Sequence, residues 1–365
     1  MSDPFQPGLL RRLPEPPREV AVVRASRIGD VVCATPAFRA LRAALPGARI
    51  TLVGLPFARD LVARSPHLDA FEPFPGFPGI AEQWFDARRA ARFFRRMQAR
   101  RFDLALQMHG SGVYANPFTL MLGARVTAGF VRPGDGPGLL DAALPLPEGL
   151  PEVERPLALA AFLGAPPRGR RPEFPLWPED HHVAASLLAG APRPLVGVHP
   201  AGTEATKRWP PERFGAAAAA LRAREGGTVV VLGGPGERPL ADAVARAAGP
   251  PCLNLAGRTT LPVLGAVLAR LAVLLTTDSG PAHVAYALGV PSVTVFGGTD
   301  PWRWAPPAGG PHAVLARPVP CRPCGYDECP VGYPCLAAVT VEEAVAAAEG
   351  VLRRAEGPAQ MNSTR

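Results

Sequence analysis

The sequence predicts an α/β protein made of two Rossmann-like, doubly wound domains that face a central cleft. Short apolar runs alternate with segments of helical periodicity along most of the chain, a pattern typical of parallel sheets. The composition changes at 165–177 (APPRGRRPEFPLW), which is rich in Pro and Arg and is typical of a linker. The length of 365 residues is typical of two domains.

These features divide the chain into five parts. They are a flexible lead-in over 1–18, an N-terminal domain over 19–177 that includes the linker, a C-terminal domain over 178–340, a helix over 341–356 and a disordered tail over 357–365. The lead-in is assigned because it is rich in Pro and Arg and has no period.

The first half reads as successive strand–helix units. Strands are predicted at Glu19–Ala25, Arg49–Leu55, Ala70–Phe74, Phe102–Met108 and Val126–Phe130, the last closing the sheet, and helices at Val31–Leu45, Phe57–Ser65, Glu82–Arg101, Asn116–Leu122 and Glu152–Leu163. Each strand is a short apolar run, and each helix has apolar residues at helical spacing.

The second half repeats the pattern after a connecting helix at Glu179–Ala189. Strands are predicted at Leu195–His199, Thr228–Leu232, Cys252–Leu255, Val273–Leu275 and Ser292–Phe296, and helices at Pro211–Arg224, Pro239–Ala248, Leu261–Arg270, 281–289 and Val341–Arg354. Two similar halves joined by a linker place their strand-end loops on either side of a cleft.

Composition indicates a globular protein with an anionic partner. The chain is 47% hydrophobic and carries 39 basic against 31 acidic residues, a net charge of +8. This balance favours nucleic acid, an anionic membrane surface or a phosphorylated substrate. No apolar run approaches the roughly 20 residues of a membrane span, and the start lacks a signal-peptide core, so we expect a cytoplasmic protein.

The densest basic segment is 88–101 (RRAARFFRRMQARR). It is either a solvated helix face or a surface that docks on anionic lipid headgroups or nucleic acid, with lipid favoured over nucleic acid. Apart from Phe93 and Phe94 the helix lacks interleaved aromatic residues, which argues against a nucleic-acid binder.

One residue stands out from the basic set. Of the 39 basic residues, Lys207 is the single Lys and the other 38 are Arg. An ammonium and a guanidinium are not interchangeable at a tight point-charge site. A lone Lys in such a composition therefore indicates a functional position, with chance as the alternative.

The segment 273–298 (VLLTTDSGPAHVAYALGVPSVTVFGG) predicts an anion site. An apolar strand leads through a tight turn at 276–280 into a helix opened by Pro281. The start of such a helix offers backbone N–H groups at the positive end of its dipole. Asp278, Ser279 and His283 lie where they can face that ligand.

Two further elements converge on the same anion. The loop Ala201–Thr206 offers a hydroxyl and N–H groups, and Lys207 offers a compact positive charge. Together with the turn they suit a diphosphate. Glu237 follows the next strand and either accepts bonds from a ribose or is a helix-start charge.

Asp30 occupies the corresponding place in the first half. It lies at the carboxyl end of the first strand, where open α/β sheets bind ligands, although a helix N-cap is an equal alternative. A single carboxylate that faces an activated leaving group suits general-base activation of an acceptor hydroxyl. The chain carries no GxGxxG after its first strands and no P-loop, which argues against a dehydrogenase and an NTPase.

Four cysteines lie within fifteen residues in the segment CRPCGYDECPVGYPC. They are Cys321, Cys324, Cys329 and Cys335. Zinc or an iron–sulfur cluster is one reading, and a reduced structural loop is the favoured one, because the spacing matches no standard zinc pattern and cytosolic disulfides are disfavoured.

The combination of motifs resembles glycosyltransferase family 9, the ADP-heptose:lipopolysaccharide heptosyltransferases, which have the two-domain GT-B architecture. The matching segments are RASRIGDVVCATPAFRAL (24–41), VGVHPAGTEATKRWPPERF (196–214), VVVLGGPGE (229–237), NLAGRTTL (254–261) and TTDSGPAHVAYALGVPSVTVFG (276–297). The resemblance covers Val20 to about Leu352, and a CxPC segment also recurs in the family.

The resemblance implies inverting transfer of a sugar, heptose in the named members, from a β-linked ADP-sugar without a required cofactor. The N-terminal domain would bind a lipopolysaccharide-core or other glycan or glycolipid acceptor, and the C-terminal domain the nucleotide-sugar. Asp30 matches the family's proposed base and Lys207 its phosphate-binding lysine. The other matches are Thr203 in the phosphate loop, Glu237 at the ribose, and Asp278, Ser279 and Gly280 at the sugar and diphosphate.

The resemblance also implies contact with the inner face of the membrane, and 88–101 would supply it. The alternative function is a non-catalytic nucleotide-sugar-binding or regulatory protein of the same fold. The presence of Asp30, Lys207 and Asp278 argues against that alternative.

Overall fold

A computed structural model describes residues 3–356 of the chain. The described chain forms two compact units, one that ends at Pro175 and one that begins at Leu176. This boundary falls inside the segment 165–177 that the sequence predicts as a linker. The predicted tail at 357–365 lies outside the described residues.

Unit 1 is a six-stranded parallel sheet in the order β3-β2-β1-β4-β5-β6. Its strands are β1 (Glu19–Val23), β2 (Arg49–Gly54), β3 (Ala70–Pro73), β4 (Leu104–Gln107), β5 (Val126–Val131) and β6 (Ala142–Pro145), and its helices are α1 (Leu9–Arg12), α2 (Ile28–Ala44), α3 (Ala58–Arg64), α4 (Ala87–Ala99), α5 (Ala115–Leu120) and α6 (Glu154–Leu163).

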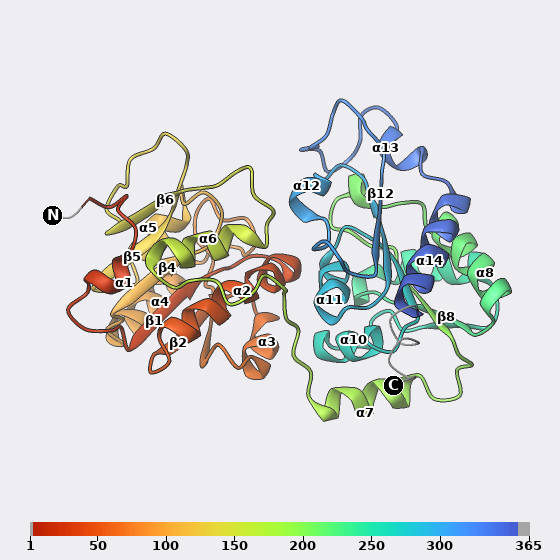
Figure 1. The fold of residues 1–365 in the computed structure, drawn as a ribbon, viewed down its shortest axis with the longest axis horizontal. Coiled ribbons are helices and arrows are strands. Elements are labelled where there is room, and N and C mark those ends of the chain that lie inside the picture. The colour runs from red at the N-terminus through yellow and green to blue at the C-terminus, as the bar shows by residue number, and fades with distance from the viewer. Residues whose placement is uncertain (1–2, 357–365) are drawn as a thin grey trace, which may run out of the picture. The chain divides into compact units, whose positions relative to one another are not determined.

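Helices cover both faces of this sheet. Ala21 and Val23 of β1 pack in a core with the inner faces of α4 and α5, where Phe93, Phe94 and Phe118 lie. Because side chains alternate along a strand, the buried Val20 and Val22 point to the opposite face. Helices α2 and α6 of the same unit pack side by side (Figure 1).

Unit 2 has the same topology, with a six-stranded parallel sheet in the order β12-β11-β10-β7-β8-β9. Its strands are β7 (Leu195–His199), β8 (Thr228–Val231), β9 (Cys252–Asn254), β10 (Val273–Thr277), β11 (Ser292–Phe296) and β12 (His312–Ala316), and its helices are α7 (Pro178–Leu187), α8 (Pro211–Glu225), α9 (Arg238–Ala248), α10 (Leu261–Leu268), α11 (Gly280–Leu288), α12 (Pro301–Trp304), α13 (Pro334–Ala337) and α14 (Val341–Glu356). The predicted α/β class with two doubly wound sheets is therefore confirmed.

The main core of unit 2 lies between its sheet and α8, α9 and α14. Trp209 and Phe214 are fully buried there, with their rings edge to face and their centroids 4.9 Å apart. Trp209 Nε1 donates to the carbonyl of Val339, so the buried indole has its hydrogen-bond partner. Two residues after Lys207, Trp209 thus anchors the end of the Lys207 loop to the core.

The order of strands defines one switch point in each sheet. In unit 1 the chain reverses its direction of strand addition between β1 and β4, and in unit 2 between β7 and β10. The loops that leave the carboxyl ends of two such strands diverge, and the crevice between them is where doubly wound sheets bind ligands. Each unit therefore has one topologically favoured ligand position.

Two edge strands were not predicted from the sequence. Val126–Phe130 was expected to close the first sheet, but β6 pairs with β5 outside it, and β12 pairs with β11 at the edge of the second sheet. Both runs are short, β6 contains Pro145 at its end, and β12 is only half-buried. Edge strands need less apolar burial, so their sequence signal is weak.

The start of α4 and the lead-in also differ from the sequence prediction. The helix expected from Glu82 begins at Ala87, because Asp86 caps it by accepting from Arg89 N. The lead-in expected to be flexible contains α1, in which Leu9 is buried, and Gly8 N donates to the Phe162 carbonyl at 2.7 Å. The described part of the lead-in is thus packed on unit 1.

Across residues 3–356, no helix combines the length and apolar character needed to cross a bilayer.

Candidate active site

The predicted anion turn of unit 2 lies at the switch point, at the carboxyl end of β10. Ser279 is the N-cap of α11 with an extended backbone (φ −155°), and Pro281 follows at the helix start. The Ser279 hydroxyl contacts the carbonyl of Thr277 at 3.2 Å and His199 Nδ1 at 3.2 Å. The turn therefore presents its hydroxyl in a fixed position.

Lys207 comes from the loop after β7, the other strand at the switch point. It ends a short 3-10 turn, η1 (Ala205–Lys207), and its carbonyl accepts a hydrogen bond from the Thr277 hydroxyl. Its Nζ lies 3.0 Å from Glu204 Oε2. The backbone contact joins the Lys207 loop to the end of β10, so Lys207 lies next to the 278–281 turn.

Arg208 holds the same loop through hydrogen bonds to its main chain. Its Nε donates to the carbonyl of Gly202 at 2.7 Å and its Nη2 to the carbonyl of Thr203 at 2.8 Å. A Cβ on Gly202 would lie 3.0 Å from Lys207 Cβ, so glycine fits the close approach of the two residues. The Thr203 side chain itself is exposed.

His199, which was not among the predicted site residues, also lies at this switch point. The last residue of β7, it is 4% exposed and its Nε2 lies 3.5 Å from Glu237 Oε2. It thus bridges the Ser279 hydroxyl and the Glu237 carboxylate. Its position at the carboxyl end of a switch-point strand was the signal that could have identified it.

Glu237 is held as a carboxylate by its surroundings. Hydrogen bonding to His199 lowers its pKa, and Gly234 N donates to its Oε2 at 2.6 Å. The half-exposed side chain follows β8, next to the switch-point strand β7. A fixed, ionised acceptor at this place suits a ligand with hydroxyl donors.

Asp278 and His283 form a buried pair. The two side chains are 5% and 6% exposed, and His283 Nε2 lies 3.6 Å from Asp278 Oδ1. Burial works to raise the pKa of Asp278, but the contact with His283 and the charge of Lys207 outweigh it, so the pKa is lowered. The His283 ring also packs edge-on against Tyr286 and Trp304. This geometry favours His283 as a support for Asp278 over the predicted ligand contact.

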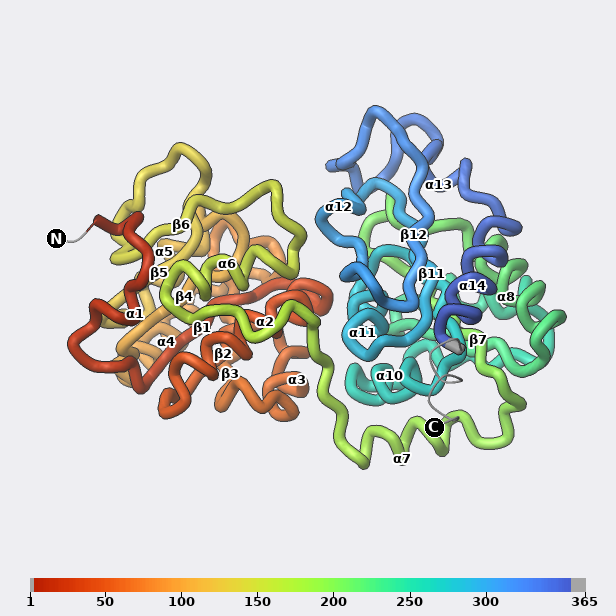
Figure 2. The backbone as a smooth tube through the Cα atoms, viewed as in Figure 1, coloured from red at the N-terminus to blue at the C-terminus, as the bar shows by residue number. Residues whose placement is uncertain are grey.

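The cysteine segment supports the Lys207 loop. Residues 321–333 of this segment lie in the long loop between β12 and α13 (Figure 2), and Cys335 lies in α13. Thr206 donates through its hydroxyl to the Tyr326 carbonyl at 2.9 Å and through its N–H to the Asp327 carbonyl at 3.3 Å. Cys324 N donates to the carbonyl of Gly298, and Gly298 N donates to the carbonyl of Thr206.

The metal reading of this segment gains no support. Within residues 3–356, no three His, Cys, Asp or Glu side chains are grouped so that they could hold a metal ion. Cys321 is exposed, Cys335 is buried, and Cys329 Sγ accepts from Tyr333 N at 3.1 Å. The surroundings of these three cysteines therefore differ.

Asp30 lies at the switch point of unit 1. It is in the first turn of α2, where the helix dipole favours a carboxylate, but the N-cap position belongs to Arg27. The cap alternative for Asp30 is therefore wrong. Its side chain is 24% exposed and lies 3.3 Å from Arg24 Nη2. Asp30 thus combines access to solvent with a cationic neighbour.

His109 lies on the loop after β4, on the other side of that switch point. Its Nδ1 is 2.9 Å from the Ser26 hydroxyl, and its Nε2 is 3.9 Å from Glu82 Oε2. Burial is the largest influence on the ring and lowers the pKa of His109, so the imidazole is neutral at pH 7. Asp30 and the neutral His109 thus lie on the two sides of the switch point of unit 1.

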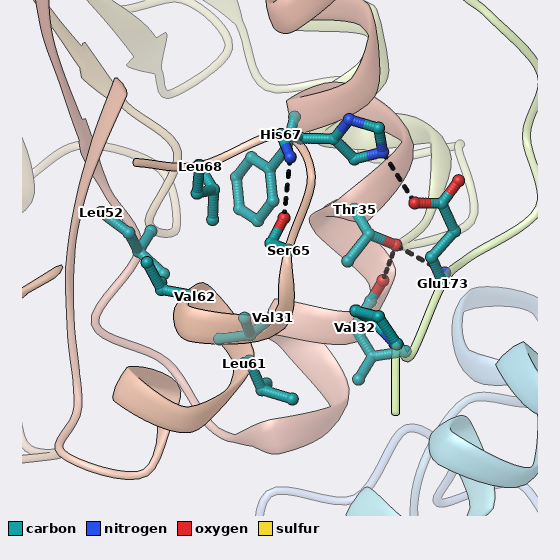
Figure 3. Close-up of a pocket in the computed structure, with 12 residues that line it drawn as sticks. Val31, Val32, Thr35, Leu52, Leu61, Val62, Ser65, His67, Leu68 and Glu173 are labelled. Carbon is teal, nitrogen blue, oxygen red and sulfur yellow. Dashed lines mark hydrogen bonds and ion pairs between the residues drawn. The ribbon is translucent and has the colours of Figure 1, made fainter. Parts of the chain in front are cut away.

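A small cavity between α2 and α3 is lined mainly by apolar side chains (Figure 3). Its volume of about 20 Å³ is room for about one water molecule. Glu173 closes one side, where it accepts from Arg39 and from His67 Nε2 at 2.7 Å while its N–H donates to Thr35. The cavity is too small for a substrate, and its polar rim fastens the end of unit 1 onto α2.

A family model described as Glycosyltransferase family 9 (heptosyltransferase) matches residues 90–333, two thirds of the chain. The chain belongs to glycosyltransferase family 9. It is thus a glycosyltransferase, and the two doubly wound sheets are the fold of this GT-B family.

Relatives agree with this assignment. The chain is 30% identical over 302 residues to lipopolysaccharide heptosyltransferase 2 of Salmonella typhimurium, covering 78% of the chain and 84% of the relative. The structure of Escherichia coli ADP-heptose LPS heptosyltransferase II matches with a TM-score of 0.76 at 23% identity, over 93% of this chain and 99% of that one. That of E. coli heptosyltransferase WaaC with ADP matches with a TM-score of 0.65 at 21% identity, over 89% and 97%.

Proposed function

We propose that this family 9 glycosyltransferase transfers heptose from ADP-heptose to a hydroxyl of a lipopolysaccharide-core acceptor. The observation that carries the proposal is the convergence of Lys207 and the 278–281 turn at the switch point of unit 2. A point charge and a helix start together match a diphosphate. The structures compared above include E. coli ADP-heptose LPS heptosyltransferase II and E. coli heptosyltransferase WaaC with ADP.

The donor is held in three places in this proposal. Lys207 binds the diphosphate, with Thr203 on the neighbouring loop. Ser279 and Gly280 bind the same diphosphate at the start of α11, where the helix dipole favours negative charge. Asp278 contacts the sugar, and Glu237, fixed by His199, accepts from the ribose hydroxyls.

The chemical step is a single displacement. The acceptor oxygen bonds to C1 of the heptose, the bond from C1 to the β-phosphate oxygen breaks, and ADP leaves with that electron pair. Asp30 takes the proton of the acceptor hydroxyl. Lys207 and the start of α11 stabilise the charge that develops on the departing diphosphate.

The experiment is a transfer assay with ADP-, UDP- and GDP-sugars and a lipopolysaccharide-core acceptor. We expect product and free ADP from ADP-heptose, with no product from the UDP- or GDP-sugars. Binding of ADP-heptose without turnover on any core acceptor would favour the non-catalytic alternative, and turnover of another nucleotide-sugar would replace the proposed donor.

We also propose that unit 1 contacts an anionic membrane surface through α4. Arg88, Arg92 and Arg95 form one exposed stripe of the helix, and in the described part of the chain none of them has an acidic partner. Trp84, which is 87% exposed, lies just before the N-cap of α4, four positions ahead of Arg88. A tryptophan beside unpaired arginines suits the headgroup region of a bilayer.

Replacing the three arginines with Gln is expected to weaken binding to anionic vesicles by about 10²-fold, since each basic residue near such a surface contributes about 1 kcal/mol. Co-sedimentation with phosphatidylglycerol vesicles and with phosphatidylcholine vesicles measures this. The matched control replaces Arg49, Arg246 and Arg258 with Gln, which removes the same charge elsewhere. Equal loss in both triple variants would contradict a role for α4.

A further inference from the structure

We infer that Arg24 and Glu152 are a positioning pair that fixes the orientation of the Asp30 carboxylate and sets its affinity for a proton. The inference rests on the proposed role of Asp30 as the general base. It assigns functions to two buried residues that the chemistry above does not use.

Arg24 holds Asp30 at two points. It follows β1 and is 3% exposed. Its Nη2 donates to the Asp30 carbonyl at 3.1 Å and to Asp30 Oδ1 at 3.3 Å. Contact with both the main chain and the side chain of one residue restricts the carboxylate to a narrow range of rotamers.

Arg24 is itself fixed by unit 1. Its Nη1 donates to the carbonyl of Met108 at the end of β4, and its Nη2 also donates to Glu152 Oε1 at 2.7 Å. The guanidinium thus joins both strands of the switch point to the segment before α6. Its planar fork of donors makes these contacts simultaneously, which an ammonium could not.

Glu152 offsets the charge of Arg24. Its side chain is 4% exposed, and Arg155 Nη1 lies 3.9 Å from its Oε2. Burial works to lower the pKa of Arg24, but Glu152 and Asp30 outweigh it and the pKa is raised, so Arg24 stays protonated. The remaining titratable neighbours are His109, Glu82 and Cys33.

The two members of the pair act on Asp30 with opposite sign. A nearby positive charge favours the ionised carboxylate, so Arg24 lowers its proton affinity. Glu152 accepts a hydrogen bond from the same guanidinium and adds a negative charge nearby, so it raises the proton affinity of Asp30. Arg24 alone would make Asp30 a weak base, and Glu152 restores part of its basicity. A buried ion pair kept only for stability would have no such effect on catalysis.

The test is the pH dependence of kcat/KM for transfer in R24Q, E152Q and the double variant. The base must be ionised, so activity rises with pH through the pKa of Asp30. R24Q is expected to move this rise to higher pH by about one unit, and E152Q to move it to lower pH. In the double variant, the rise is expected at a pH near that of the wild type. Single variants that move the rise in the same direction, or leave it in place, overturn the inference.

A second pair of variants separates charge from geometry. R24K keeps the charge but cannot reach all the acceptors, so kcat is expected to fall about tenfold while the pH of the rise stays near that of wild type. E152D, which keeps its charge, should likewise leave the rise in place. A displaced rise in R24K would overturn the division into charge and positioning.

Folding is checked on the same samples. ADP binding by calorimetry reports the fold of unit 2, and far-ultraviolet circular dichroism with the thermal midpoint reports the whole chain. If R24Q does not fold, E152Q still tests the effect of charge and R24K the effect of geometry. If D30N retains transfer, the proposed base is wrong. If D30N is inactive but the rise does not respond to Arg24 or Glu152, only the present inference fails.

Discussion

Replacing Asp30 with Asn is expected to reduce transfer by about 10²–10⁴-fold, the range that general-base catalysis contributes. The Asn side chain has nearly the same shape and can still accept from Arg24 Nη2, so the site keeps its packing. It cannot take the proton of the acceptor hydroxyl. Initial rates of ADP release, with acceptor present and absent, measure the effect.

Donor binding separates this result from a general loss of structure. The donor contacts proposed here lie in unit 2, so ADP affinity is expected to stay within about twofold of the wild type in D30N. Asp60→Asn is the matched control, because Asp60 is an exposed carboxylate in the first turn of α3 in the same unit. Near-normal transfer by D30N would remove Asp30 from the role of base.

Replacing Lys207 with Ala is expected to weaken ADP binding by about 10–100-fold. A charge-assisted hydrogen bond to a diphosphate contributes roughly 1.5–3 kcal/mol, and the chain has no other Lys. Titration calorimetry with ADP measures this, and adenosine should lose little affinity because it lacks the diphosphate.

Two variants make that result specific to Lys207. Arg246→Ala removes an exposed cation from the last turn of α9 and is expected to leave ADP affinity unchanged. Lys207→Arg keeps the charge in a different shape and should recover part of the affinity. Unchanged ADP affinity in Lys207→Ala would show that the diphosphate binds elsewhere.

Local sequence pattern was sufficient for much of the fold. β7 and β11 have the predicted bounds, because each is an apolar run between breaking residues such as Pro194 and Pro200. The edge strands β6 and β12 were missed because half-buried, Pro-flanked runs have little periodicity. The predicted start of α4 was five residues too early, because the Asp86 cap excludes residues 82–86 from the helix.

The candidate site was predictable where its residues form a local motif. Lys207 and the 278–281 turn are recognisable from composition and from a strand–turn–helix pattern. His199 required knowledge of which strands meet at the switch point. Arg24 and Glu152 are separated by 128 positions, so no local pattern indicates that they bond. Such contacts are set by the strand order of the sheet.

The measurement that tests the proposed chemistry most directly is the anomeric configuration of the product formed from β-linked ADP-heptose, determined by nuclear magnetic resonance. Single displacement with Asp30 as the only catalytic carboxylate predicts inversion, and so an α-linked heptose. Retention would require a covalent sugar intermediate on a second nucleophile and would contradict the mechanism.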